Sequence, residues 1–103
     1  MKSLETIQKQ LQAGSFEFTR HAFKRAVERN ISEQEIREAG TVTEMIEDYP
    51  DDKYAPSSLI LGFTNNNRAL HIQVSRLDTD EVKIITLYEP DNRQWIEYRR
   101  RRR

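Results

Sequence analysis

Apolar side chains recur every three or four residues over positions 3–39, which is the pattern of amphipathic helices. It predicts a helix over residues 3–13, followed by Gly14, a residue that readily takes the left-handed conformation after a helix end. A second helix is predicted from Arg20 to Arg29. Its apolar stripe consists of Ala22, Phe23, Ala26 and Val27.

Polar residues at the expected helix ends fit known capping roles. Thr19 is placed to cap the second helix, and Asn30 is suited to the left-handed turn that would end it. Ser32 and Glu35 have the spacing of a capping box, which would open a third helix through Ala39. These signals predict two to three helices in the N-terminal part of the chain.

After residue 40 the apolar pattern changes from the period of a helix to that of a strand. Strands are predicted over residues 42–47, 58–64, 70–75 and 82–88. The segments between them are short and rich in Asn, Asp and Pro, which favours turns and antiparallel pairing. The predicted fold is therefore α+β, with two to three N-terminal helices packed on a twisted antiparallel sheet of about four strands.

Composition narrows the class of protein. The chain has 103 residues, the length of one domain, and it contains no Cys, which excludes disulfides and thiolate zinc sites. No segment approaches the roughly 20 apolar residues that span a bilayer, and the N-terminus does not resemble a signal peptide. We expect a cytoplasmic protein that makes no membrane contact.

The net charge of zero conceals a basic end. Residues 99–103 are all Arg, and without them the chain carries 12 basic and 17 acidic side chains. The prediction is a domain over residues 1–98 followed by a basic tail. The tail is either a disordered, solubilising end or a contact for phosphate or an acidic partner, with Arg99 as a candidate substrate-binding residue. A binder of RNA or DNA that works through this tail alone is a further alternative.

The second predicted helix carries candidate chemistry. His21, Arg25 and Arg29 form one polar stripe, because residues four apart lie close together around a helix. The guanidinium fork matches two phosphate oxygens, and His can transfer a proton near neutral pH. The alternative is that the two arginines are solvated, or pair with Glu28, Glu33 or an acidic loop.

His71 lies in a strictly alternating strand, beside Gln73 on the face opposite the apolar residues. If the helices cover the apolar face, His71 stands on the open face, near Thr86 and Tyr88 of a neighbouring strand. Such a polar face could hold RNA, although an ordinary solvated sheet face would have the same pattern.

Aromatic residues outside the predicted elements offer a further contact for RNA. Tyr54 and Trp95 could stack on bases if they are exposed, although Trp95 is better suited to the core. The chain has no glycine-rich phosphate loop, no zinc-protease motif and no serine nucleophile motif. Two isolated histidines do not make a metal site, so we expect any catalysis to be acid–base chemistry without a metal or cofactor.

Several of these stretches together resemble a known bacterial family. They are residues 18–22 with Arg25, residues 29–32, residues 46–54, residues 70–72, residues 85–91 and Trp95. Their order and spacing are similar to those of the family called domain of unknown function 4258, from about Phe16 to Arg102. One departure is Asn30, where the family usually has Gly; Asn also tolerates the left-handed conformation.

The resemblance implies a place among RelE-like toxins, in the larger set of barnase- and colicin-like ribonucleases. It implies helices on an antiparallel sheet, a small antitoxin protein as partner, and metal-independent RNA cleavage. In that reaction the 2′-hydroxyl attacks the adjacent phosphate, which requires a base, an acid and a cation.

The leading hypothesis is a toxin-type endoribonuclease. We assign His21 as general base or acid, with His71 or Tyr88 as its counterpart. The candidate substrate-binding residues are Arg25, Arg29, Thr86 and Arg99. The alternative is a non-catalytic binding module, or a degenerate toxin, that binds RNA or a protein partner.

Overall fold

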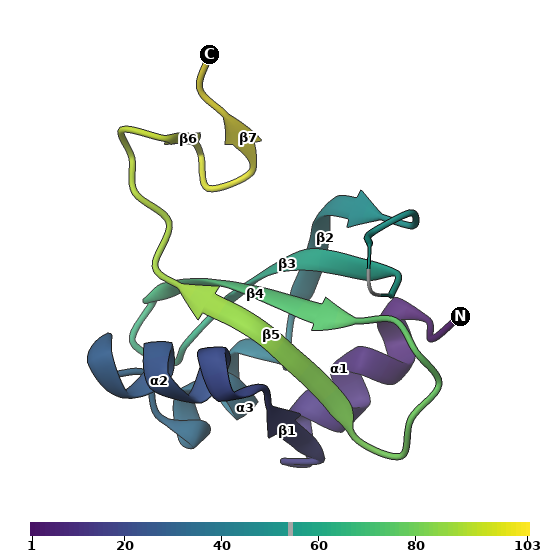
Figure 1. Cartoon of the computed structure of the whole chain (residues 1–103). Helices are drawn as coiled ribbons and strands as arrows, with labels where there is room; N and C mark the ends of the chain where they lie inside the picture. Colours follow the sequence, from purple (N-terminus) through teal and green to yellow (C-terminus); the bar gives the residue numbers. More distant parts are fainter. Residues whose placement is uncertain (54) are drawn as a thin grey trace.

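The computed structural model describes residues 1–53 and 55–103, so the predicted stacking residue Tyr54 lies outside the described residues. The described elements up to residue 39 are α1 (Leu4–Gln12), β1 (Phe16–Phe18), α2 (Arg20–Glu28) and α3 (Glu33–Ala39). Four longer strands follow, namely β2 (Thr43–Tyr49), β3 (Ser57–Phe63), β4 (Ala69–Ser75) and β5 (Val82–Tyr88). A small hairpin of β6 (Trp95–Ile96) and β7 (Arg100–Arg101) ends the chain, as Figure 1 shows.

The predicted helix ends are confirmed. Thr19 caps α2 through its hydroxyl, and Ser32 and Glu35 form a complete capping box at the start of α3. Gly14 and Asn30 both have positive φ, at 75° and 55°. Local signals therefore set the lengths of these helices.

The sheet differs from the prediction of about four antiparallel strands. Its order is β1-β5-β4-β3-β2, and β1 pairs with β5 in parallel. With only three residues, Phe16–Phe18 is too short for alternation to identify it as a strand. Thr19, which follows it, donates from its N–H to the Ile84 carbonyl (3.0 Å) and from its hydroxyl to the Ile85 carbonyl (3.1 Å). The start of α2 is thereby attached to the edge of β5.

The helices cover one face of the sheet and form the main core with it (Figure 1). Leu70, Ile72 and Val74 of β4 are buried there, as the alternation predicts. Gly62 in β3 lies so close to α3 that a Cβ atom would come within 2.3 Å of the Ala39 carbonyl oxygen. The remaining large buried side chains of this core are Ile7, Leu11, Ile36, Ile60, Val82, Ile84 and Leu87.

The packing of α2 corrects one part of the predicted apolar stripe. Ala22 and Ala26 are buried, but Phe23 and Val27 are 60% and 66% exposed. The two small alanines let the helix approach the sheet closely. The larger side chains lie to one side, where Phe23 packs edge-on against Phe18.

A β-bulge in β5 determines which residues face away from the helices. The register with β4 shifts at this point, so that Ile84 and Leu87, three residues apart, are both in the main core. Thr86 and Tyr88 consequently lie on the opposite face with His71. A regular strand would have divided these residues differently between the two faces.

The opposite face is not open, which corrects the expectation for His71. The C-terminal hairpin lies on that side of the sheet, and under it His71 has no exposed surface. Leu59, Leu61 and Trp95 are only 3%, 2% and 2% exposed, and none of them belongs to the main core. Trp95 is buried as predicted, but with Leu59 and Leu61 outside the main core. In the described part of the chain, no helix has the length and apolar character needed to cross a bilayer.

Candidate functional site

The last turn of α2 is fixed to the edge of β5. Strand β1 pairs only with Val82–Ile84, so the C-terminal half of β5 has no neighbouring strand on this side. Arg29 fills part of the gap, because its Nη1 donates to the Leu87 carbonyl oxygen at 2.7 Å. No acidic side chain of the described residues pairs with Arg29, so the rest of its guanidinium can bind an anion.

A shallow pocket of about 550 Å³ lies beside this arginine. Arg29 and Tyr88, predicted separately from a helix and a strand, both line it. Gln94, at the start of the C-terminal hairpin, lines its other side. Arg68 and Glu89 complete the pocket.

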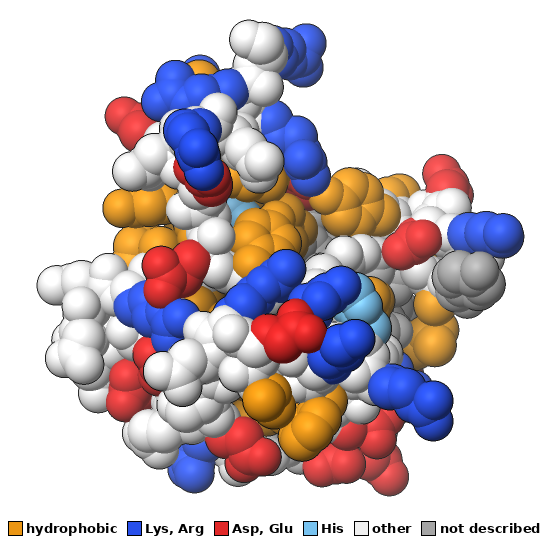
Figure 2. Space-filling view, turned by 60° about the vertical axis from the view of Figure 1, so that its left-hand side comes forward, with side chains coloured by type: hydrophobic (Ala, Val, Ile, Leu, Met, Phe, Trp, Pro, Cys, Tyr) orange, Lys and Arg blue, Asp and Glu red, His pale blue; other side chains and the backbone are white. Residues whose placement is uncertain are grey.

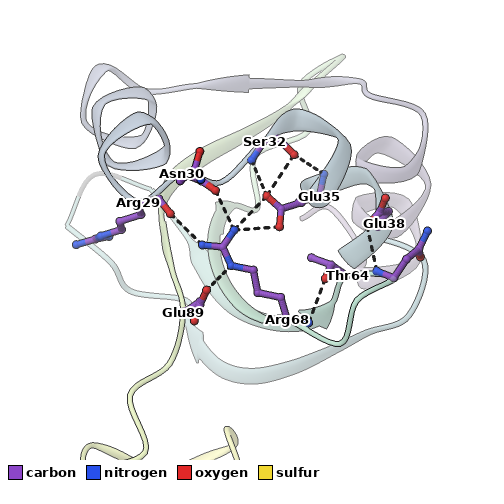
Figure 3. A network of polar contacts seen from close by, with 9 residues as sticks. Arg29, Asn30, Ser32, Glu35, Glu38, Thr64, Arg68 and Glu89 are labelled. Atoms are coloured by element: carbon purple, nitrogen blue, oxygen red, sulfur yellow. Dashed lines mark hydrogen bonds and ion pairs between the residues drawn. The ribbon is translucent and has the colours of Figure 1, made fainter.

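Arg68 is a structural residue that sequence reasoning missed. Its Nη2 donates to the Arg29 carbonyl oxygen (2.9 Å), and its Nη1 donates to the Asn30 carbonyl oxygen (2.9 Å). Nη1 also reaches both carboxylate oxygens of Glu35, at 3.0 and 2.9 Å, while Nε is bonded to Glu89. Figure 3 shows these contacts converging on the corner between α2 and α3. The guanidinium is therefore occupied, and it holds the backbone that carries Arg29.

Electrostatics support this structural role of Arg68. Burial alone would raise the pKa of the Glu35 carboxyl, but hydrogen bonds from Ser32 and Arg68 outweigh it and hold that pKa below its usual value. No local pattern marks Arg68 in the sequence, since Glu35 is 33 positions away and Arg29 is 39. The preceding Asn-rich segment predicts only a turn.

The other two members of the predicted stripe lie on the solvent side of α2. Arg25 pairs with Glu28 at 2.8 Å, so the alternative of a local ion pair is confirmed for this residue. His21 is exposed near the start of the helix. Figure 2 shows Lys and Arg side chains gathered over α2 and again over the C-terminal hairpin, with hydrophobic side chains between the two groups.

His71 is enclosed on all sides. Its Nε2 lies 2.6 Å from the Tyr98 carbonyl oxygen and its Nδ1 lies 3.3 Å from the Tyr88 hydroxyl. The Trp95 ring packs edge-on against it, with centroids 4.5 Å apart. A carbonyl can only accept, so Nε2 carries the proton and Nδ1 accepts from Tyr88 in the neutral ring.

Burial lowers the pKa of His71, against the raising effect of its bond to the Tyr98 carbonyl. A neutral, fully bonded imidazole without exposed surface connects the sheet to the hairpin. The structure brings His71 and Tyr88 together, but it does not bring His71 into an accessible site with His21. Burial has the opposite effect on an acid: it raises the pKa of the Tyr88 phenol, which therefore stays protonated.

Two of the five C-terminal arginines, Arg99 and Arg101, pair with acidic residues of β2. Arg101 donates to both carboxylate oxygens of Glu47, at 2.8 and 3.0 Å, and its guanidinium lies 4.6 Å from the centroid of Trp95. Arg99 donates to Glu44 at 2.7 Å. The bond from Arg101 lowers the pKa of Glu47 and raises that of Arg101 itself. The candidate substrate-binding residue Arg99 is thus engaged within the protein.

Thr86, a candidate substrate-binding residue, has no role in the pocket. Thr86 lies opposite Gln73 on the face under the hairpin and does not line the pocket beside Arg29. Among the described residues, no three His, Asp or Glu side chains come together in a way that could hold a metal ion. The groups available at the pocket are the Arg29 guanidinium, the Gln94 side chain and the ring of Tyr88, whose hydroxyl is bonded to His71 Nδ1.

Comparison with known proteins places most of the chain in one family. The model of the family described as Domain of unknown function (DUF4258) matches residues 18–89. The match includes α2, Arg68, His71 and Tyr88, and it ends before the C-terminal hairpin. Searches of curated proteins and of solved structures gave no match.

Proposed function

Because the chain belongs to the DUF4258 family, whose description states no activity, we propose its function from the site: the domain binds RNA in the pocket between α2 and the C-terminal hairpin. The observation that carries the proposal is the juxtaposition of Arg29 and Tyr88. Arg29 is held by one nitrogen and presents the others, while Tyr88 offers an aromatic ring beside it. A guanidinium for phosphate and a ring for a base are the two elements that single-strand-binding sites combine.

Binding by fluorescence anisotropy with a single-stranded RNA of about 16 nucleotides, the upper end of site sizes for small binding domains, tests the proposal. Arg29→Gln should weaken binding about 10- to 100-fold, since a hydrogen bond to a charged group is worth about 1.5–3 kcal/mol. Lys9→Gln is the control, because it removes one exposed charge on α1. Equal affinities for the two variants would refute the proposed site.

The second candidate function is toxin-type endoribonuclease activity in the cytoplasm. The observation that favours it is that the Arg29 guanidinium, a cation for the developing charge, lines one pocket with Tyr88, whose hydroxyl would act as the proton donor once it leaves His71 Nδ1. His21 is exposed at the start of α2 and does not line the pocket, so as the base it would act on an RNA that extends from Arg29 along the helix. His71 has no direct part, since it has no exposed surface.

The variant Tyr88→Phe separates the two functions. It keeps the ring for stacking and removes the proton donor, so RNA binding should be retained while cleavage of a labelled RNA is lost. Its unfolding must be checked in parallel, because His71 Nδ1 loses a partner. Cleavage at the wild-type rate by Tyr88→Phe and His21→Ala would rule out the proposed acid and base.

The grouping with RelE-like toxins and a RelE- or barnase-like arrangement are part of this second proposal. The helices on one face of the sheet support them at the level of an α+β fold, whereas the five strands and the parallel β1–β5 pair differ from the expected sheet of about four antiparallel strands. A small antitoxin protein would then be the partner. Growth arrest on induced expression, relieved by His21→Ala, is the corresponding cellular test.

A further inference from the structure

The five C-terminal arginines divide into two groups by whether an acidic side chain pairs with them. Arg99 and Arg101 face the acids of β2, which they neutralise. No acidic side chain in the described part of the chain pairs with Arg100, Arg102 or Arg103, and all three are exposed. Part of the positive charge of the hairpin therefore remains available for an anion.

The available arginines adjoin the pocket beside Arg29. The Arg102 N–H donates to the Gln94 carbonyl oxygen at 2.8 Å, and Gln94 lines that pocket. The Arg102 Nε donates to the Asn92 carbonyl oxygen at 2.7 Å, which holds its side chain along the hairpin. A second hollow begins on this side, of about 710 Å³, lined by residues 99–103 with Ile46, Glu47 and Ile96.

From this arrangement we infer that single-stranded RNA bound in the pocket continues onto the C-terminal hairpin, where the exposed and unpaired Arg100 and Arg103 contact its phosphates. The inference rests on the proposed function. Figure 2 shows the two basic groups on one face of the molecule, separated by hydrophobic side chains. One strand can therefore cross from α2 to the hairpin over the hydrophobic side chains between them, with phosphates bound at both ends.

The expected ligand is a single-stranded RNA long enough to reach both basic groups. A strand that reaches both basic groups must be longer than the few nucleotides that the pocket alone can hold. The protein should accordingly prefer long single strands to short ones. Its affinity for the long ones should depend more steeply on salt, because more phosphates are neutralised.

Salt titrations with RNA of about 4 and about 16 nucleotides test this, since they bracket the site sizes of small binding domains. The double variant Arg100→Gln/Arg103→Gln should reduce the slope of log K against log salt by about 1.4 for the long RNA, at about 0.7 per phosphate contact. Affinity at low salt should fall several-fold, while binding of the short RNA stays unchanged. The matched control is Lys9→Gln/Lys83→Gln, which removes two exposed charges on α1 and at the far end of β5.

The outcomes separate this inference from the proposed function. An unchanged slope in the hairpin variant, with weaker binding by Arg29→Gln, overturns the inference alone. A reduced slope in the hairpin variant, without any effect of Arg29→Gln, overturns the proposed pocket and supports the hairpin contact. A poly-glutamate peptide that binds the wild type more tightly than the long RNA does, and loses this in the hairpin variant, overturns RNA as the ligand of the hairpin.

Discussion

Replacing Arg101 by Gln should release the C-terminal hairpin without unfolding the rest of the domain. Arg101 makes two charge-assisted hydrogen bonds to Glu47 and covers the ring of Trp95. Its side chain is 59% exposed, so solvent screening limits the ion pair to at most about 1 kcal/mol. The cation–π contact adds about 0.5–1 kcal/mol at an exposed site. The two together amount to at most about 2 kcal/mol.

That free energy acts on a local equilibrium. Hairpin opening exposes Trp95 and His71 but leaves the helices on the opposite face of the sheet in place. A loss of at most about 2 kcal/mol raises the open population by up to roughly 30-fold, since about 1.4 kcal/mol corresponds to a factor of ten. Partial opening of this kind is common in elements joined to the fold by few contacts.

Trp95 provides the assay because it is the only tryptophan in the chain and is 2% exposed. In Arg101→Gln, acrylamide quenching of its fluorescence should increase, and its urea transition should precede the loss of far-UV circular dichroism. Arg100→Gln is the charge-matched control, since Arg100 lies outside the ion pairs with β2. Unchanged quenching in Arg101→Gln, with coincident transitions, would refute the view that this arginine locks the hairpin.

Further predictions concern pH, the α2–α3 corner and the close contact in β3. Because burial lowers the pKa of His71, the open hairpin binds a proton more readily than the closed one, so Trp95 quenching should increase as pH falls below about 6.5. His71→Gln should abolish this step. Arg68→Gln should lower the free energy of unfolding by about 1–3 kcal/mol in urea titrations, because Glu35 and the carbonyl groups of Arg29 and Asn30 would lose a partly buried partner. Arg68→Lys should not restore it, because a single ammonium cannot replace the fork. Gly62→Ala should destabilise the protein by about 1–3 kcal/mol in the same assay, since its Cβ would overlap the backbone of α3.

The accuracy of prediction from sequence differed between local and distant features. The caps at Thr19 and Ser32 and the left-handed residue Asn30 were predicted because each acts on backbone groups within a few positions. The buried face of β4 followed from its alternation. By contrast, the exposure of Phe23 depended on how closely α2 approaches the sheet, which the sequence pattern does not contain.

The candidate site shows the same division. Arg29 and Tyr88 were both chosen from sequence, but only packing of α2 against β5 places them in one pocket. His71 has the sequence pattern of a residue on an open face, and its burial depends on a hairpin that begins more than twenty positions later.

The sequence by itself therefore determined the helices, the long strands and the residue types available for chemistry, because these depend on near neighbours in the chain. The tertiary structure alone decided that β1 joins β5 in parallel, that Arg68 holds the corner beneath Arg29, and that His71 is enclosed. It also decided which C-terminal arginines are neutralised and which face solvent. The physical reason is that hydrogen bonds, ion pairs and burial between distant segments exist only after the chain has brought them together.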